Sequence, residues 1–355
     1  EEGYTNASPF CSDGPRLDEF LAEMRREVFE GREGYMNVGE APGITPERNE
    51  FITNPAHKEL DMLFLFDHVS IDQSPESKWD THAFVPKKLQ DRMSRQQEAV
   101  RNAGWASLFF CNHDQPRVVS RWGNDSDRES RELSAKAFGM LLHMHRGTPY
   151  IYEGEELGMT NAHFTELGQY RDLEAINAYR QRVEEARCQS PESMMAALAL
   201  IGRDNSRTPM QWDASRYAGF TPADAATEPW IGVNPNHVEI NAAEEFDDPD
   251  SVYGFYKKLI AMRHNSATVA TGEWNLVAAD DEQVYAFTRT SGDDTILVVV
   301  NLTDRSAGLP GEVAELLGDG VAESQILLST YDVAHGVKSI ARGELARWEG
   351  VVIQL

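Results

Sequence analysis

Short apolar runs that end abruptly in polar residues recur along the first half of the chain. The runs, each of the length of a β-strand, span residues 35–38, 62–66, 106–111 and 149–152. Carboxylates follow each of them within a few residues, and amide and imidazole groups follow the third. Strands that are apolar along their whole length are typical of a parallel sheet, whose polar groups sit at the carboxyl ends of the strands.

Segments with apolar residues at helical spacing separate these runs. They span residues 17–29, 85–103 and 129–144, and further helical patterns reach residue 265 around a Gly- and Pro-containing interruption at 202–235. Four successive strand–helix units predict an α/β region. Beyond residue 265 the pattern changes to β-forming runs at 284–290, 295–302, 326–328 and 350–355. Strands without intervening helices predict a separate antiparallel domain there.

Composition narrows the class of protein. Hydrophobic residues make up 41% of 355, enough for a large core, and the net charge of −25 argues against nucleic acid or an anionic membrane as a partner. Three scattered cysteines provide neither a disulfide framework nor a zinc cluster, which favours a cytoplasmic setting, and Cys111 within an apolar run is expected in the core. The chain has no run of 18 apolar residues and no signal peptide, and it opens on Glu1-Glu2, which suggests a piece of something longer.

Two carboxylates stand out because both follow predicted strands of one sheet. Glu40 follows the first run and Asp114 follows the third, so a parallel sheet would bring them to the same edge. Paired carboxylates suit glycoside hydrolysis, in which one protonates the leaving oxygen and another stabilises or attacks the sugar carbon. Acids after strands are also common helix N-caps, so the residues alone leave both interpretations open.

Other polar groups are less specific. His113 could donate to a sugar hydroxyl or be an ordinary loop histidine, and Arg117 and Arg121 could be ordinary surface cations. Residues 203–212 are dense in hydrogen-bonding groups, as in a substrate loop or a loop with internal salt bridges. Four tryptophans are candidate sugar-stacking platforms or core residues: Trp105, Trp122, Trp212 and Trp230. No phosphate-binding or metal-binding motif is present, so no cofactor and no metal is expected.

At these residues the sequence resembles a known family. Asn112-His113-Asp114-Gln115-Pro116-Arg117 resembles the last of the short blocks shared by the alpha-amylase superfamily (glycoside hydrolase family 13), and Val38-Gly39-Glu40 resembles the preceding block. Residues 154–161 and 202–212 resemble stretches of its oligo-1,6-glucosidase and alpha-glucosidase branch. The blocks stand in family order, and the resemblance reaches Leu355.

The resemblance implies a fold and an activity. The fold would be the second half of a TIM (β/α)8 barrel, strands five to eight, over residues 1–268, followed by an antiparallel all-β C-terminal domain over residues 269–355. The activity would be retaining hydrolysis of terminal α-1,6- or α-1,4-glucosidic bonds in short oligosaccharides such as isomaltose. Glu40 resembles the general acid/base and Asp114 the transition-state-stabilising carboxylate. His113, Arg207 and, less closely, Arg203 resemble residues that bind the terminal glucose.

The departure from the family pattern is large. The nucleophilic aspartate of the family follows the fourth barrel strand, and no such block is present. The opening Glu1-Glu2-Gly3-Tyr4 resembles the loop after that strand, so the chain is expected to begin just beyond the nucleophile. The first three strands, the inserted domain and the calcium-binding loop of some relatives are also missing. A retaining mechanism needs both carboxylates, so the chain alone is predicted to be inactive.

There are three alternatives to an oligo-glucosidase, and particular residues of this sequence argue against each of them. Trehalose-6-phosphate hydrolases usually diverge from the Ala41-Pro42-Gly43-Ile44-Thr45 found here, and sucrose isomerases carry an Arg-rich loop where residues 72–77 stand. A non-catalytic binding subunit, like the amylase-like heavy chains of amino-acid transporters, is a third alternative, which Glu40 and Asp114 together disfavour. The preferred linkage, the preferred chain length and the oligomeric state stay open.

Overall fold

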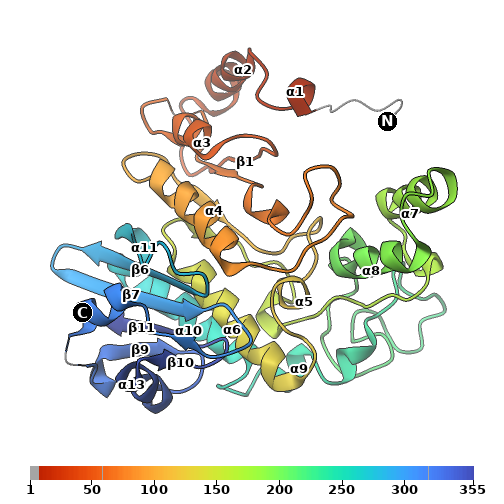
Figure 1. The fold of residues 1–355 in the computed structure, drawn as a ribbon. Helices are drawn as coiled ribbons and strands as arrows, with labels where there is room; N and C mark the ends of the chain where they lie inside the picture. Colours follow the sequence, from red (N-terminus) through yellow and green to blue (C-terminus); the bar gives the residue numbers. More distant parts are fainter. Residues whose placement is uncertain (1–7, 58, 319) are drawn as a thin grey trace.

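The computed structural model describes residues 8–57, 59–318 and 320–355 (Figure 1). The Glu1–Tyr4 segment, on which the expected start beyond the nucleophile depends, lies outside the described residues. The described residues form a four-stranded sheet in the order β1-β2-β3-β4 and a five-stranded sheet in the order β5-β6-β7-β11-β9, with β8 and β10 as a small separate pair. The chain thus has an α/β part followed by an antiparallel part, as predicted.

The four predicted parallel strands are confirmed, although each is shorter than its apolar run. They are β1 (Val38–Glu40), β2 (Met62–Phe64), β3 (Ala106–Leu108) and β4 (Thr148–Pro149), each parallel to the next. β1 begins at Val38 and not at residue 35; just before it, the Asn37 and Asp61 side chains each accept a hydrogen bond from the other residue's N–H, at 2.6 and 2.8 Å. Within the described residues, β1 and β4 each have one partner strand, so the sheet is open at both edges.

Of the helices that precede and separate these strands, α2, α4 and α6 follow the predicted apolar spacing. They are α1 (Ser8–Cys11), α2 (Leu17–Met24) with a π-helical turn at Arg25–Phe29, α3 (Pro46–Thr53), α4 (Pro86–Ala99), α5 (Val118–Arg121) and α6 (Arg128–Met144). α3 was not predicted, although Thr45, which accepts from Arg48 N–H at 3.2 Å, and Pro46 at its first position form a helix start signal. Leu133, Met140 and Leu141 of α6 are buried, as expected.

A series of helices joins β4 to the antiparallel sheet. It contains α7 (Leu173–Tyr179) with a π-helical turn at Arg180–Glu185, α8 (Pro191–Ile201), α9 (Ala242–Glu245), α10 (Val252–Asn265) and α11 (Ala267–Thr271). Short 3-10 turns are His68–Ser70, Glu155–Leu157, Leu167–Gln169, Arg203–Asn205, Pro235–Val238 and Glu323–Gln325. Figure 1 shows α7 and α8 far from the antiparallel sheet, whereas α10 lies beside α6.

The C-terminal region is antiparallel, but the expectation of strands without helices between them is wrong. Its elements are β5 (Glu273–Val277), β6 (Val284–Ser291), β7 (Asp294–Asn301), β8 (Ala307–Gly308), α12 (Gly311–Leu317), β9 (Ile326–Ser329), α13 (Val333–Arg342), β10 (Glu344–Leu345) and β11 (Gly350–Gln354). Asp332 caps α13 by accepting from His335 N–H at 2.7 Å, and Gly343 ends it at φ +69°. These local cues outweigh the β-forming composition around them.

The antiparallel sheet shares a core with the α/β part. Phe287 and Val298 on one face pack in a cluster with Met93 of α4 and Phe138 of α6, whereas the alternate residue Val299 packs on the other face with Ile340 of α13. Both faces are therefore covered, which explains why residues 296–300 of β7 are all apolar. The predicted boundary at residue 268 falls inside α11 and remains a prediction. Among the described helices, none has the length and hydrophobicity needed to cross a bilayer.

Candidate active site

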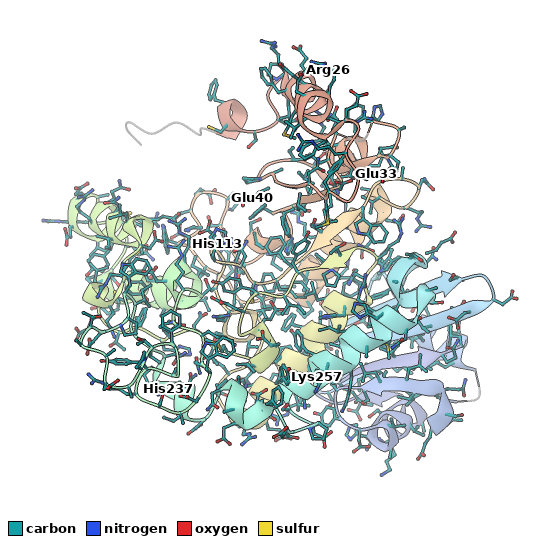
Figure 2. The ribbon with its side chains drawn as sticks, turned by 180° about the vertical axis from the view of Figure 1, so that it is seen from behind. Arg26, Glu33, Glu40, His113, His237 and Lys257 are labelled. Carbon is teal, nitrogen blue, oxygen red and sulfur yellow. The ribbon has the colours of Figure 1, made fainter. Side chains whose placement is uncertain are left out.

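Glu40 lies at the carboxyl end of β1 with its side chain exposed. Gly39 precedes it, and a Cβ at that position would lie 2.6 Å from Leu63 Cδ1, so any larger residue there would displace the Leu63 side chain. Glu40 lines a cavity of about 230 Å³ whose other walls come from the ends of β2, β3 and β4. His113 lines the same cavity, and Figure 2 shows both residues in the same region of the molecule. The sheet edge therefore brings together two of the predicted residues.

Aromatic side chains line most of this cavity. They are Phe64, Phe66, Phe109, Tyr150 and Tyr152. Cys111 also lines it and is buried, as predicted for a small core residue. Below it, Glu155 accepts a hydrogen bond from the Tyr256 hydroxyl at 3.1 Å, and burial raises the pKa of Glu155 to about 7. A cavity with an aromatic wall and a few polar groups at its rim suits a ring with hydroxyl substituents.

Asp114 stands at the centre of an ion-pair cluster beside the cavity. A tight turn presents it, because Asn112 Oδ1 accepts from the Asp114 N–H at 2.7 Å. Arg207 Nη2 donates to Asp114 Oδ1 at 2.6 Å, and Arg203 Nη1 donates to the same oxygen at 3.3 Å. His113 Nε2 lies 3.6 Å from Asp114 Oδ2, and the His113 carbonyl accepts from Arg207 Nε at 2.8 Å. Four of the five predicted site residues thus contact one another.

Two buried carboxylates, neither of them among the predicted site residues, hold the arginines in place. Asp172 accepts from Arg203 Nε at 2.8 Å and from Nη2 at 2.6 Å, and this fork raises the pKa of Arg203 above its ordinary value. Asp204 is fully buried and accepts from the N–H groups of Arg171 and Asp172 at 2.6 and 2.8 Å. The first residues of the dense polar run at 203–212 are therefore braced by hydrogen bonds to residues 171 and 172. The sequence signal that could have indicated Asp172 is its position as the N-cap residue of α7.

The interpretation of Arg117 and Arg121 as surface cations is wrong. Their exposed fractions are 1% and 7%. Arg121 forms two bonds of 2.7 Å with Asp72, while Arg117 donates to the Ser206 carbonyl at 3.3 Å and lies over the Tyr152 ring. Both arginines therefore tie the Asp114 loop to neighbouring loops.

The candidate stacking tryptophans divide by burial. Trp122 is 2% exposed and donates to Asp72 at 2.9 Å, and Trp105 is half-buried and donates to Thr148 at 2.8 Å. Trp122 is therefore a core residue. Trp212 and Trp230 are 53% and 65% exposed, so their ring faces remain accessible.

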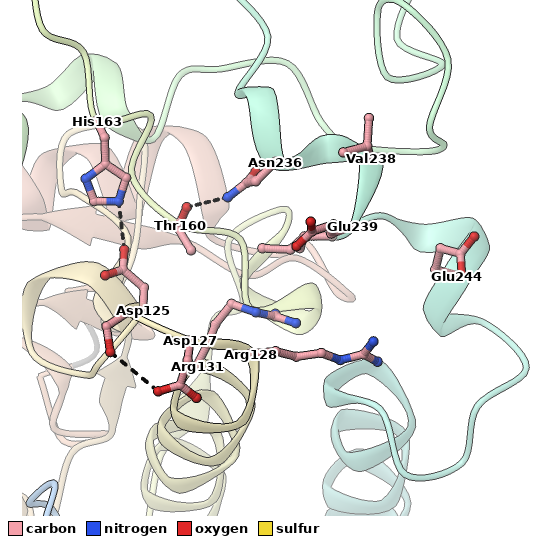
Figure 3. Close-up of a pocket in the computed structure, with 12 residues that line it drawn as sticks. Asp125, Asp127, Arg128, Arg131, Thr160, His163, Asn236, Val238, Glu239 and Glu244 are labelled. Carbon is pink, nitrogen blue, oxygen red and sulfur yellow. Dashed lines mark hydrogen bonds and ion pairs between the residues drawn. The ribbon is translucent and has the colours of Figure 1, made fainter.

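A cleft of about 480 Å³, separate from these residues, lies between the start of α6 and the 236–244 segment (Figure 3). It contains no predicted site residue. His163 Nε2 pairs there with Asp125 at 2.8 Å, and this hydrogen bond raises the pKa of His163 above 6.5. Among the described residues, no group of three or more His, Cys, Asp and Glu side chains is arranged to bind a metal ion.

The His163–Asp125 pair predicts a pH-dependent contribution to stability. Because folding raises the pKa of His163, the contribution is present below the unfolded pKa of 6.5 and disappears as pH rises through the folded value. His163→Asn should lower the free energy of unfolding by about 0.5 kcal/mol near pH 5.5, a small value because the pair is partly exposed, and by almost nothing near pH 9. Denaturant unfolding at both pH values measures this. Equal losses at the two pH values, or the same pattern in His264→Asn, an exposed histidine without a carboxylate partner among the described residues, would contradict it.

Comparisons with known proteins agree with this geometry. Residues 1–272 match the alpha-amylase catalytic domain family, and residues 275–323 match the maltogenic amylase C-terminal domain family. The chain is 41% identical to an oligo-1,6-glucosidase of Parageobacillus thermoglucosidasius over 99% of its own length and 60% of the relative. It is 47% identical to an alpha-glucosidase of Pediococcus pentosaceus over 79% and 50%.

Solved structures give the same result. A trehalose-6-phosphate hydrolase of Bacillus licheniformis matches with a TM-score of 0.86 and 38% identity over 99% of this chain and 61% of that one. An isomaltulose synthase of Klebsiella sp. LX3 matches with a TM-score of 0.85 and 32% identity over 96% and 59%. The chain thus spans about 60% of the length of such relatives. The matches over its whole length show that the chain belongs to the alpha-amylase family, with the oligo-1,6-glucosidases among its relatives.

Proposed function

We propose that this chain is the part of a retaining α-glucosidase that carries the general acid/base. The enzyme would act on terminal α-1,6- or α-1,4-glucosidic bonds of short oligosaccharides such as isomaltose. The observation that carries the proposal is the convergence of Glu40 with the His113–Asp114 turn at one edge of the parallel sheet, around an aromatic cavity. Relatives named oligo-1,6-glucosidase and alpha-glucosidase support the class of substrate.

The geometry supports a division of roles. Glu40, which is exposed to the cavity, would protonate the leaving oxygen and later activate water. Asp114 has Oδ1 engaged by Arg207 and Arg203, which leaves Oδ2 to accept from the hydroxyls of the terminal glucose. His113 is 64% exposed and can donate to a neighbouring hydroxyl. The two arginines then fix the carboxylate while the ring distorts toward the transition state.

A retaining mechanism needs a second carboxylate about 5 Å from the acid/base. Besides Glu40, the two cavities that it lines contain one acid among the described residues, Asp13, which is paired with Arg48 at 3.0 Å. The described walls of these two cavities thus offer no unpaired carboxylate besides Glu40, and we expect the 355-residue chain alone to be inactive. A cytoplasmic setting also stays a proposal, which the exposed free thiols of Cys11 and Cys188 support.

The first test is release of p-nitrophenol from p-nitrophenyl α-glucoside. The purified chain should show no turnover above the uncatalysed rate, and a longer form that includes any residues encoded before Glu1 should be active. Turnover by the 355-residue chain would contradict the requirement for a further carboxylate. Absence of turnover by both forms would favour the non-catalytic binding subunit.

Trehalose-6-phosphate hydrolysis is the second candidate, because a solved enzyme of that name matches with a TM-score of 0.86. A 6-phosphate needs cationic partners, and His113 is the one candidate cation among the residues that line the Glu40 cavity. Comparing isomaltose, maltose and trehalose 6-phosphate as substrates of the longer form separates the two functions.

A further inference from the structure

A cleft of about 450 Å³ lies between the 164–171 segment and the loops at 216–217 and 228–237. It contains none of the residues assigned to the candidate active site. His237, which lines it, appears well apart from Glu40 and His113 in Figure 2. Its volume lies within the range of small-molecule sites, which is about 300–1,000 Å³.

Trp230 gives this cleft its apolar surface. The indole is 65% exposed, although the next residue, Ile231, is 1% exposed and packs in the α7–α8 core cluster with Trp79 and Leu198. The buried isoleucine anchors the loop next to the tryptophan, which lines the cleft. A large aromatic side chain left in water on an anchored loop is a common feature of binding surfaces.

Groups that can form hydrogen bonds surround the indole. Arg171 donates to the Gly168 and Tyr170 carbonyls at 2.6 and 3.2 Å and makes no ion pair among the described residues. Arg216 stacks on Tyr217 and lies 3.7 Å from Glu228, a loose pair in which both side chains are exposed.

His237 adds an acceptor to this set. Its Nδ1 lies 3.0 Å from the Asn234 carbonyl, so that nitrogen carries the proton and Nε2 is left as an acceptor. The cleft thus offers donors, acceptors and one aromatic face.

We propose that this cleft is a second saccharide-binding site, in which a pyranose ring stacks on Trp230 and its hydroxyls bond to Arg171, Arg216, Glu228 and His237. A pyranose has an apolar C–H face and a rim of hydroxyls, which matches an indole face ringed by planar polar groups. The choice of a glucose oligosaccharide rests on the proposed function.

The cleft also adjoins the arginine cluster without entering it. The Arg171 N–H donates to Asp204, and the next residue, Asp172, holds Arg203 against Asp114. A saccharide bound at Trp230 would therefore occupy a site separate from the Glu40 cavity and leave that cavity free.

Isothermal titration calorimetry of the 355-residue chain with isomaltotriose tests the site. Trp230→Ala should weaken binding by about tenfold or more, and Arg216→Ala by a smaller factor. Trp212→Ala is the matched control, because Trp212 is similarly exposed but does not line the cleft, and it should bind within about twofold of the unchanged chain. Arg207→Ala, at Asp114, should also keep this binding.

Two results would overturn the proposal. One is saturable binding that Trp230→Ala leaves intact or that Arg207→Ala abolishes, which would place the saccharide at Asp114. The other is the absence of saturable binding by the unchanged chain at millimolar isomaltotriose. Both results concern binding and not turnover, so the two proposals can fail separately. If binding depends on Trp230 but the longer form does not hydrolyse the substrate, only the proposed function is refuted. If the longer form hydrolyses the substrate but Trp230→Ala binds isomaltotriose as well as the unchanged chain does, only this site is refuted.

Discussion

Glu40→Gln in the longer form is expected to lower kcat/KM for isomaltose by about 10³-fold, within the range for losing a general acid/base. Glutamine keeps the size of the side chain but cannot transfer a proton to the leaving oxygen. The loss should be smaller for p-nitrophenyl α-glucoside, because p-nitrophenolate leaves without protonation and only the water-activation step is then impaired. Steady-state kinetics with both substrates measures the difference.

Glu153→Gln is the matched control. Glu153 also follows a strand of the parallel sheet and its side chain is exposed, yet it does not line the Glu40 cavity. Its substitution should leave kcat/KM within about threefold. Equal losses in the two variants, or an equal loss on both substrates in Glu40→Gln, would remove Glu40 from the acid/base role.

Asp114→Asn in the longer form is expected to lower kcat by about 10²- to 10³-fold on both substrates alike. The substitution removes the negative charge that Arg207 and Arg203 share, and with it the stabilisation of positive charge developing on the sugar. The fold should persist, because Arg203 keeps Asp172 and Arg207 keeps the His113 carbonyl. Kinetics together with a thermal unfolding curve separates lost catalysis from lost structure.

Asp80→Asn is the matched control for that experiment. Asp80 pairs with Arg182 at 2.6 Å and is about as exposed as Asp114, but it lines no cavity that contains Glu40. It should leave kcat unchanged. A normal kcat in Asp114→Asn, or a drop in kcat matched by Asp80→Asn, would contradict the proposed role of Asp114.

The sequence allowed the sheet and the meeting of its carboxyl ends to be predicted, because both depend on local pattern. Apolar runs followed by Glu40 and by Asn112-His113-Asp114 define parallel strands, and parallel strands end at one edge. The proximity of Glu40 and His113 around one cavity follows from that rule. The family resemblance implied that Arg203 and Arg207 bind the terminal glucose, but their contact with Asp114 was not predicted, since 89 and 93 residues separate these partners.

The errors concern partners that are distant in sequence. Arg121 was interpreted as a surface cation because its partner Asp72 lies 49 residues earlier, and no local pattern indicates such a pair. Likewise, Asp172 and Asp204 brace the arginines through contacts that only the folded loops create. In the C-terminal region, α13 depends on an Asp332 cap and on packing against the sheet, whose strands dominate the composition of the region.

Chemical rescue by azide tests the central claim, that Glu40 is the acid/base of a retaining glucosidase. In the longer form, Glu40→Ala should hydrolyse p-nitrophenyl α-glucoside slowly, because no base activates water against the glucosyl-enzyme intermediate. Azide needs no base, so adding it should restore p-nitrophenol release and yield glucosyl azide of the α configuration, identified by NMR. No acceleration by azide, or a product of the β configuration, would contradict the assignment.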